Sequence, residues 1–240
     1  MKIDIAIGFY RGYDLWPLVL EGLERNRENI NQVIVVNDEP WGEPLVSSLP
    51  LKTFAFPEHQ GFGVSRVINK GFELAETEYV LHIDDDVLLT PNLIEVLLGS
   101  IEPGLLVMPN AREVGLEEAK AMATENDTKP IQTRVAKLCN GRTFAPPWFQ
   151  ITGTIYLAKR NEFLECQWNE DMQDYGGQDY EWAIRWFCQG KGIKRTKNIV
   201  PVVAREKKKQ FEEGSTNFHM MSNAVDRFYL TFNKQTEDFC

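Results

Sequence analysis

Carboxylates follow two of the apolar, β-branched segments of this chain. Asp38 comes directly after VIVVN, and the run Asp84, Asp85 and Asp86 comes directly after YVLHI. Short apolar segments of this kind are typical of buried parallel strands. Ligands of open parallel sheets bind outside the carboxyl ends of the strands. We therefore expect these aspartates at one edge of one sheet.

The run Asp84, Asp85 and Asp86 places three charges of the same sign side by side. A divalent cation relieves such repulsion, and hard ions such as Mg²⁺ or Mn²⁺ prefer carboxylate oxygens and keep positions open for water and phosphate. Alternate residues of an extended segment face the same way, so Asp84 and Asp86 can share a pocket while Asp85 faces elsewhere. The other interpretation is a solvated strand-to-helix turn with one aspartate as a cap.

A second segment with chemical potential is DYGGQDYEWAIRW, in which a glycine turn leads to a helix start near Asp179. Aromatic faces stack on sugar rings, and a carboxylate among them can take a proton from a hydroxyl. The alternative is an aromatic core helix capped by Asp179. The aromatic residues around it in sequence are Trp168, Tyr175, Tyr180, Trp182 and Trp186.

Arg66, the histidines and a basic run are the remaining candidates. Arg66 could neutralise a diphosphate or be an exposed helix residue. His82 lies inside a predicted strand and is expected to be structural, whereas His219 could ligate a metal or be a surface residue. Arg205 and residues 207–209 could clamp phosphate, although such a basic run is usually a solvated loop.

The elements that must position these residues alternate between strand and helix, which predicts an α/β fold with a mostly parallel sheet and helices on both faces. Between them, residues 110–147 are predicted to be an irregular polar segment. Thr90 and Pro91 are predicted to be the N-cap and first residue of one helix. The predicted strands are 3–7, 33–37, 52–56, 79–83, 104–108, 151–160 and 199–204, and the predicted helices are 14–26, 64–75, 91–101, 179–189 and 219–232.

Length and composition limit the function classes. The chain has 240 residues, enough for one sizeable α/β domain, and its net charge of −9 argues against a module that binds nucleic acid. No apolar run approaches the ~18–20 residues of a membrane span, and Asp4 interrupts the first apolar stretch, so neither a transmembrane segment nor a signal peptide is predicted. The four cysteines form no CxxC pair, which favours reduced thiols and a cytoplasmic location.

Four segments occur in an order that resembles the GT-A fold glycosyltransferases, especially family 2. They are IAIGFYRGYDLWPLVLEGL, VIVVNDEP, HQGFGVSRVINKGFELAETEYVLHIDDDV and YGGQDYEWAIRW, and the last also resembles the G-G-E-D element of galactosyltransferases. The resemblance implies a single domain with a Rossmann-like sheet. Within it, residues 1–110 would bind a nucleotide-sugar, 111–205 would face the acceptor, and 206–240 would form a flexible loop and a C-terminal helical segment.

On the donor side, the resemblance implies that Gly8 and Phe9 meet the nucleotide base and that Asp38 touches uracil or a similar base. Arg66 matches a frequent arginine beside the diphosphate. The aspartate run resembles the D-x-D motif. By that match Asp86 would bind Mn²⁺ or Mg²⁺, and Asp84 or Asp85 would contact the ribose or the sugar.

On the acceptor side, the resemblance makes Asp179 the catalytic base. Gln178 stands where the family usually has glutamate, and Arg205 stands near a usual metal-binding histidine, which His219 could replace. The residues expected to contact the acceptor are Trp148, Tyr175, Gln178 and Trp182.

The function that the resemblance implies is metal-dependent transfer of a sugar from a nucleotide-diphosphate-sugar donor to a carbohydrate or other hydroxyl acceptor, by a hexosyltransferase-type enzyme. We expect a UDP-sugar as the donor and inversion at the anomeric carbon. Two alternatives remain at this point. One is a sugar-phosphate nucleotidyltransferase, although IGFYRGYD lacks the G-x-G of a phosphate loop. The other is a non-catalytic carbohydrate-binding or scaffold protein.

Overall fold

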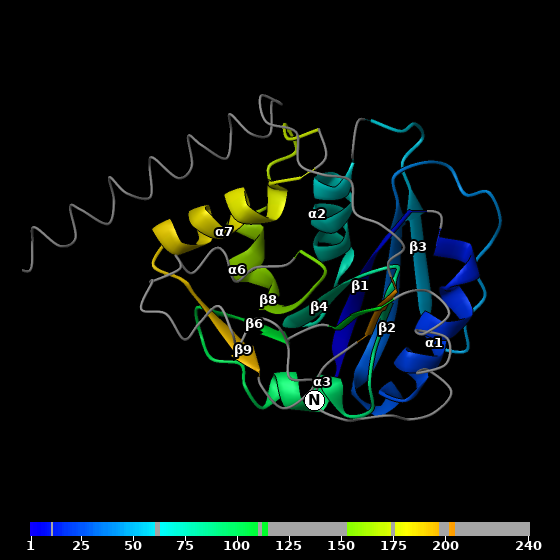
Figure 1. The fold of residues 1–240 in the computed structure, drawn as a ribbon, viewed down its shortest axis with the longest axis horizontal. Helices are drawn as coiled ribbons and strands as arrows, with labels where there is room; N and C mark the ends of the chain where they lie inside the picture. Colours follow the sequence, from blue (N-terminus) through cyan, green and yellow to red (C-terminus); the bar gives the residue numbers. More distant parts are fainter. Residues whose placement is uncertain are drawn as a thin grey trace, which may run out of the picture.

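The computed structural model describes residues 1–10, 12–60, 63–109, 112–114, 153–173, 176–196 and 202–204, and for 112–114 and 202–204 only the backbone. Its centre is a seven-stranded sheet in the order β3-β2-β1-β4-β8-β6-β9, beside a three-stranded sheet in the order β5-β10-β7 (Figure 1). Most of the predicted polar segment, and the predicted helix 219–232, lie outside the described residues.

The large sheet consists of β1 (Ile3–Phe9), β2 (Ile30–Asn37), β3 (Leu51–Ala55), β4 (Tyr79–Asp84), β6 (Leu105–Pro109), β8 (Ile155–Lys159) and β9 (Gly192–Thr196). The small sheet consists of β5 (Val87–Leu88), β7 (Arg112–Val114) and β10 (Val202–Ala204). The described helices are α1 (Trp16–Glu24), α2 (Val64–Leu74), α3 (Leu93–Leu98), α6 (Arg160–Leu164) and α7 (Gln178–Cys188), with short 3₁₀ turns η1 (Gly12–Asp14) and η2 (Arg27–Asn29).

Six of the seven strands of the large sheet run in one direction, and β8 runs against them. β1 is parallel to β2 and β4, whereas β8 is antiparallel to both β4 and β6. The chain extends from β1 to β2 and β3 on one side and then crosses to β4 on the other. This reversal of strand order places a crevice at the carboxyl ends of β1 and β4, where ligands of such sheets bind.

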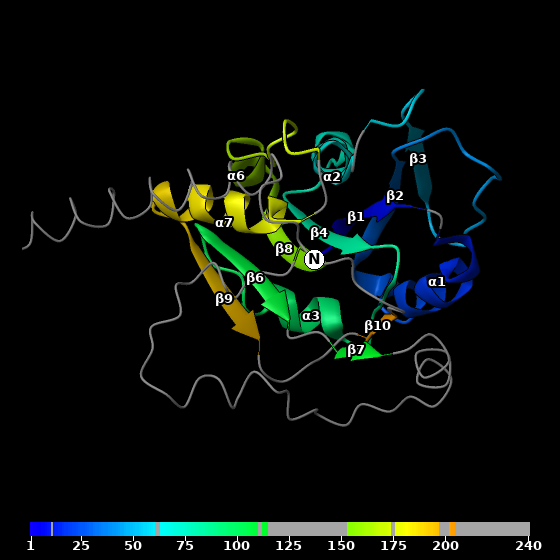
Figure 2. The same ribbon diagram turned by 45° about the horizontal axis from the view of Figure 1, so that its top comes forward.

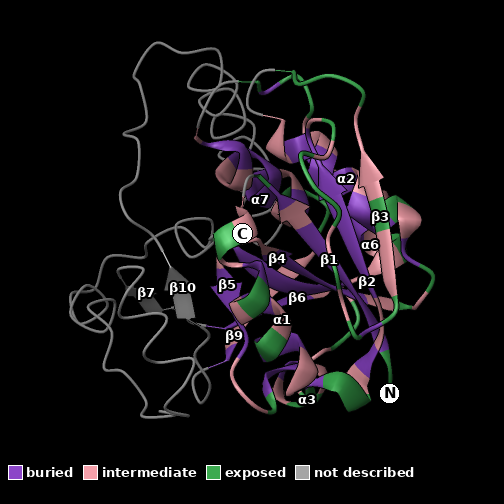
Figure 3. Ribbon diagram, turned by 90° about the vertical axis from the view of Figure 1, so that its right-hand side faces the viewer, coloured by how far each residue is buried: buried purple, intermediate pink, exposed green. Residues whose placement is uncertain are grey.

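Helices cover both faces of the sheet, as predicted. Figure 2 shows α1 and α3 on one face and α2, α6 and α7 on the other. The side chains of β1 alternate between the two layers, with Ile5 and Ile7 in one apolar cluster and Ala6 in the other. The inner strands of the sheet are accordingly buried along most of their length, whereas the edge strands β3 and β9 are mostly half-buried (Figure 3).

Three local predictions need correction. The predicted helix start at Thr90 and Pro91 is wrong, because α3 begins at Leu93 after Asn92, whose φ is 64°. The predicted strand 151–160 is too long. In the structure β8 covers Ile155–Lys159, and Arg160 already belongs to α6. Strand β9 was not predicted. It is an edge strand, and the adjacent charges Lys194 and Arg195 mask its apolar pattern.

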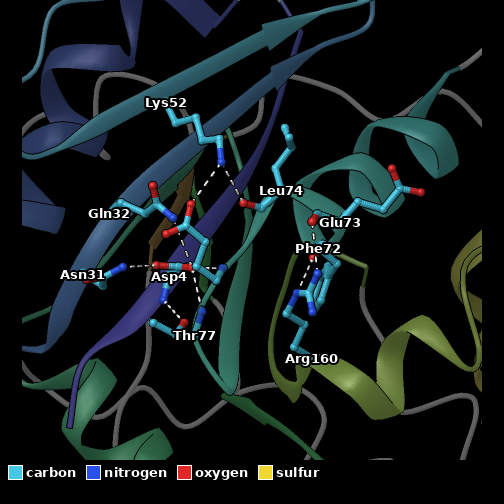
Figure 4. Close-up of polar contacts among 10 residues, drawn as sticks. Asp4, Asn31, Gln32, Lys52, Phe72, Glu73, Leu74, Thr77 and Arg160 are labelled. Atoms are coloured by element: carbon cyan, nitrogen blue, oxygen red, sulfur yellow. Dashed lines mark hydrogen bonds and ion pairs between the residues drawn. The ribbon is translucent and has the colours of Figure 1, made fainter.

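Two cations stabilise the carboxyl end of α2, where helix carbonyls lack partners within the helix. Arg160 Nε donates to Phe72 O at 3.0 Å, and Arg160 Nη2 donates to Glu73 O at 3.1 Å. Lys52 Nζ donates to Leu74 O at 3.1 Å (Figure 4). These contacts tie α2 to β3 and to the end of β8, so the helix is fixed at the edge of the sheet away from the crevice.

A fully buried carboxylate, Asp4 of β1, joins this strand to β2 and to the loop between α2 and β4. Its oxygens accept from Asn31 Nδ2 at 2.8 Å, Gln32 Nε2 at 3.3 Å, Glu76 N at 2.5 Å and Thr77 N at 3.0 Å (Figure 4). Burial alone would raise the pKa of Asp4, but these donors lower it below the ordinary value of 3.8. The ionised form is therefore the form that the fold stabilises.

Replacing Asp4 by asparagine should lower the free energy of unfolding by about 2–3 kcal/mol. The side-chain NH₂ of asparagine would face the N–H groups that now donate to the carboxylate, so these buried donors would lose their acceptor. Since the folded pKa is depressed, the contribution of Asp4 is complete above pH about 5 and is lost as the pH falls through the ordinary value. Urea denaturation of Asp4→Asn should thus show a weaker acid-side loss of stability than the wild type. Glu28→Gln, at an exposed carboxylate, is the control and should follow the wild-type profile.

Candidate active site

A pocket lies at the carboxyl ends of β1 and β4, beside the first turn of α2. The structure brings Asp38 and the aspartate run together there, as predicted from their positions after strands. The pocket is lined by Gly8, Phe9, Tyr10, Asp38, Val64, Val67, Asp84, Asp85 and Asp86. Gly8 of β1 pairs with Asp84 of β4, and an added Cβ at Gly8 would lie 3.3 Å from Val67 Cγ1. The missing side chain at Gly8 therefore lets α2 pack closely against β1 beside the pocket.

Asp85 holds the loop that follows β1. Tyr10 N donates to Asp85 Oδ2 at 2.6 Å. Burial, together with the charges of Asp86 and Asp84, raises the pKa of Asp85 to about 8, in spite of hydrogen bonds from the Tyr10 and Gly12 amides. The expectation that Asp85 would be free to contact a ribose or sugar is thus weakened, because its carboxylate is engaged with backbone amides.

Asp38 contacts two basic side chains, Arg66 and His59. Arg66 Nε donates to Asp38 Oδ1, Arg66 Nη2 donates to Asp38 O at 2.9 Å, and His59 Nδ1 lies 2.6 Å from Asp38 Oδ2. Arg66 Nη2 also donates to Glu58 O at 2.7 Å, and its guanidinium lies 4.2 Å from the Phe56 ring centroid. Arg66 is therefore engaged with Asp38 and is not among the described residues that line the pocket, and its role beside a diphosphate stays a prediction.

The side chain of Phe9 belongs to the core. It is 1% exposed and packs against Tyr13, Trp16 and Trp41, so only its backbone is available to a ligand. The next residue, Tyr10, is 51% exposed and its ring lies 6.1 Å from that of His59. Sequence reasoning missed Tyr10 and His59. The position of Tyr10 directly after β1 was the available signal, whereas nothing in the sequence places His59 on Asp38.

Asp179 lies in the first turn of α7 and next to the start of β8. Its Oδ2 accepts from Gly153 N at 3.2 Å and its Oδ1 accepts from Tyr180 N at 3.0 Å. Burial raises the pKa of Asp179, the amide donors oppose this, and the charge of Asp84 adds to the increase. Asp84 N in turn donates to Thr154 O at 3.0 Å, so Gly153 contacts the carboxylate of Asp179 and the next residue contacts the backbone of Asp84.

Of the four residues predicted to contact the acceptor, the structure describes two, and both are buried. Trp182 is fully buried and its indole Nε1 donates to Cys166 O at 2.6 Å, so the expectation that its side chain contacts an acceptor is wrong. Gln178 is 4% exposed at the start of α7, beside Asp179. Trp148 and Tyr175, together with the predicted metal ligand His219, lie outside the described residues.

The aspartate run fits a divalent cation by the chemistry of its donors. Mutual repulsion contributes to the raised pKa of Asp85, and a cation beside Asp86 would relieve it. The part of the chain that the structure describes contains no ready cluster of three or more His, Cys, Asp or Glu ligands.

Among the described residues, no helix has the length and apolar character needed to span a membrane.

A mostly parallel sheet with a ligand pocket at its switch point defines a Rossmann-like α/β domain. The chain matches the profile of the family described as glycosyl transferase family 2 over residues 5–153, which is more than half of its length. It belongs to that family. No curated protein matches it significantly in sequence.

Solved structures with this fold are GT-A glycosyltransferases. S. aureus TarS 1–349 in complex with UDP-GlcNAc gives a TM-score of 0.67 at 13% identity, covering 94% of this chain and 66% of that one. The same protein with UDP gives 0.65 at 13% identity, covering 96% and 66%. GalNAc-T7 with UDP, GalNAc and Mn²⁺ gives 0.68 at 11% identity, covering 94% and 48%. The chain thus has the GT-A fold and spans about half to two thirds of these structures.

Gly12→Ala should destabilise the loop after β1. An added Cβ would lie 2.5 Å from Asp85 Oδ2 and 2.8 Å from its Cγ, and the carboxylate cannot retreat without leaving the Tyr10 amide. We expect a loss of about 1–3 kcal/mol in the free energy of unfolding, measured by urea denaturation. Gly99→Ala is the control, since its Cβ meets nothing closer than 3.5 Å, and equal losses in both variants would contradict this packing.

Proposed function

We propose that this protein transfers a sugar from a nucleotide-diphosphate-sugar to a hydroxyl acceptor. The observation that carries the proposal is that the pocket and Asp179 are joined by adjacent residues in a family 2 chain. Asp84 lines the pocket, and its backbone amide donates to Thr154 O. The preceding residue, Gly153, donates its amide to the carboxylate of Asp179. A donor bound in the pocket would thus present its sugar toward Asp179. Family membership favours glycosyl transfer over nucleotidyl transfer and over a scaffold role.

The donor is proposed to be a UDP-sugar. TarS of the same fold was solved with UDP-GlcNAc and GalNAc-T7 with UDP, which supports uridine as the base. In this chain the base would lie near Asp38 and the exposed Tyr10, which line the same pocket. Gly8 lets the ligand approach the backbone of β1 closely.

Asp86 is proposed to hold Mg²⁺ or Mn²⁺ together with diphosphate oxygens of the donor. When bound, such an ion stabilises negative charge on the leaving nucleoside diphosphate. Asp84 is proposed to contact the donor sugar or ribose. Asp85, by contrast, fixes the loop that carries Tyr10, so that the pocket keeps its shape without the donor.

Asp179 is proposed to be the base that accepts the proton of the acceptor hydroxyl. Its raised pKa suits this role, because a carboxylate more basic than usual takes a proton more readily. The acceptor oxygen bonds to the anomeric carbon while the bond from that carbon to the diphosphate oxygen breaks, and the nucleoside diphosphate leaves. One direct attack of this kind inverts the configuration at the anomeric carbon. Gln178, next to Asp179, is proposed to contact the acceptor.

Asp179→Asn should lower the rate of sugar transfer by at least about 10²-fold, because the amide cannot accept the hydroxyl proton. Binding of the UDP-sugar, measured by calorimetry, should remain close to that of the wild type, since the donor pocket is unchanged. Asp171→Asn, at an exposed position outside the pocket, is the matched control and should keep full activity. Retained turnover in Asp179→Asn would overturn the assignment of the base.

Thermal shifts with uridine, guanosine, cytidine and thymidine diphosphates, each with Mn²⁺ or EDTA, test the donor site. A ligand that binds only the folded state raises the melting temperature by mass action, so UDP with Mn²⁺ should stabilise the wild type and EDTA should remove the effect. Asp86→Ala should lose the metal-dependent shift, whereas Asp14→Ala, at an exposed position, should keep it. A full shift in Asp86→Ala would refute its role, and no shift with any nucleotide in the wild type would refute the donor site.

A further inference from the structure

A histidine lies in the buried sheet directly behind the pocket. His82 is 0% exposed in the centre of β4, and it points to the same face as Asp84 two residues later. On that face β1 contributes Ala6 and Gly8, and an added Cβ at Gly8 would lie 3.8 Å from His82 Cε1. On the other side β8 contributes Tyr156, whose ring centroid lies 5.0 Å from that of His82.

The imidazole has little to bind in this position except the pocket carboxylate. Neither ring nitrogen of His82 makes a hydrogen bond within the described part of the chain, but Nε2 lies 3.4 Å from Asp84 Oδ1. A buried polar group without a partner costs about 1–3 kcal/mol, which an apolar residue at the same place would avoid. The other buried residues of β4, Val80, Leu81 and Ile83, are all apolar. Stability alone therefore does not explain a histidine here.

We propose that His82 is a positioning residue that fixes the carboxylate of Asp84 toward the donor. The inference rests on the proposed function, because it assumes that Asp84 contacts the donor. His82 Nε2–H would donate to Asp84 Oδ1, which restrains the side-chain rotation of Asp84 at the pocket. His82 itself does not touch the donor, because β1 and α2 cover it.

The length of the contact agrees with a site that tightens on binding. At 3.4 Å the two atoms are at the outer limit of a hydrogen bond, and such contacts in ligand-free sites often shorten when the ligand arrives. A rotation of the Asp84 side chain is sufficient to shorten it, since His82 is held between two strands. Partners that hold a ligand-binding carboxylate commonly change affinity or activity by about tenfold or more when they are removed.

Two substitutions at His82 separate positioning from packing. His82→Leu fits an apolar strand and removes the donor group, whereas His82→Gln keeps an N–H at a similar reach. We expect His82→Leu to fold with a stability equal to or above that of the wild type and yet to raise the KM for the UDP-sugar about tenfold. His82→Gln should recover most of that affinity, and the KM for the acceptor should change in neither variant.

A double-mutant cycle with Asp84→Asn completes the experiment. If His82 acts through Asp84, His82→Leu should cause no further loss of UDP-sugar affinity in the Asp84→Asn background. The inference is overturned if His82→Leu binds the donor like the wild type, if His82→Gln behaves like His82→Leu, or if the two losses simply add. Failure of the wild type to bind any UDP-sugar would instead overturn the proposed function, so the two failures are distinguishable.

Discussion

The antiparallel pairing of β8 with β4 is the interaction on which the site depends. It sets Ile155 opposite Ile83, so the two residues before β8 reach the carboxyl end of β4. Thr154 then accepts from the Asp84 amide, and Gly153 donates to Asp179. A parallel strand at this place would bring its own carboxyl end to the pocket and would lead the chain away. The reversed strand instead joins the end of β4 to the start of α7.

The fold distributes the negative charge at this edge among partners of different kinds. Asp38 is paired with Arg66 and His59, and Asp85 is held by backbone amides. Asp84 and Asp86 line the same pocket, and the charge of Asp84 reaches as far as Asp179. A cation and a diphosphate would complete this arrangement, because each compensates the charge that the other brings. The pocket is thus shaped before its ligand is present, which lowers the cost of ordering it on binding.

Polar contacts at the amino ends of β1 and β4 hold the elements that carry these carboxylates in place. Asp4 fastens β1 to β2 and to the loop before β4, and Arg160 and Lys52 hold the carboxyl end of α2. The strands and the helix that form the pocket are therefore anchored away from it. Loops at the carboxyl ends can then carry polar groups, such as Tyr10 and His59, without weakening the core.

The sequence by itself determined the order of the elements and the edge at which the aspartates gather, since β-branched segments such as VIVVN and YVLHI bury themselves whatever surrounds them. It did not determine β9, because the charged residues of this edge strand mask the apolar pattern. It also did not determine that Trp182 is buried, because an aromatic-rich helix can place such a side chain in the core or at a ligand. Only the tertiary structure decided that Arg66 pairs with Asp38 and that His82 lies behind Asp84. Such pairings join residues that the local pattern cannot relate, because they depend on register and layer packing rather than on neighbours in the chain.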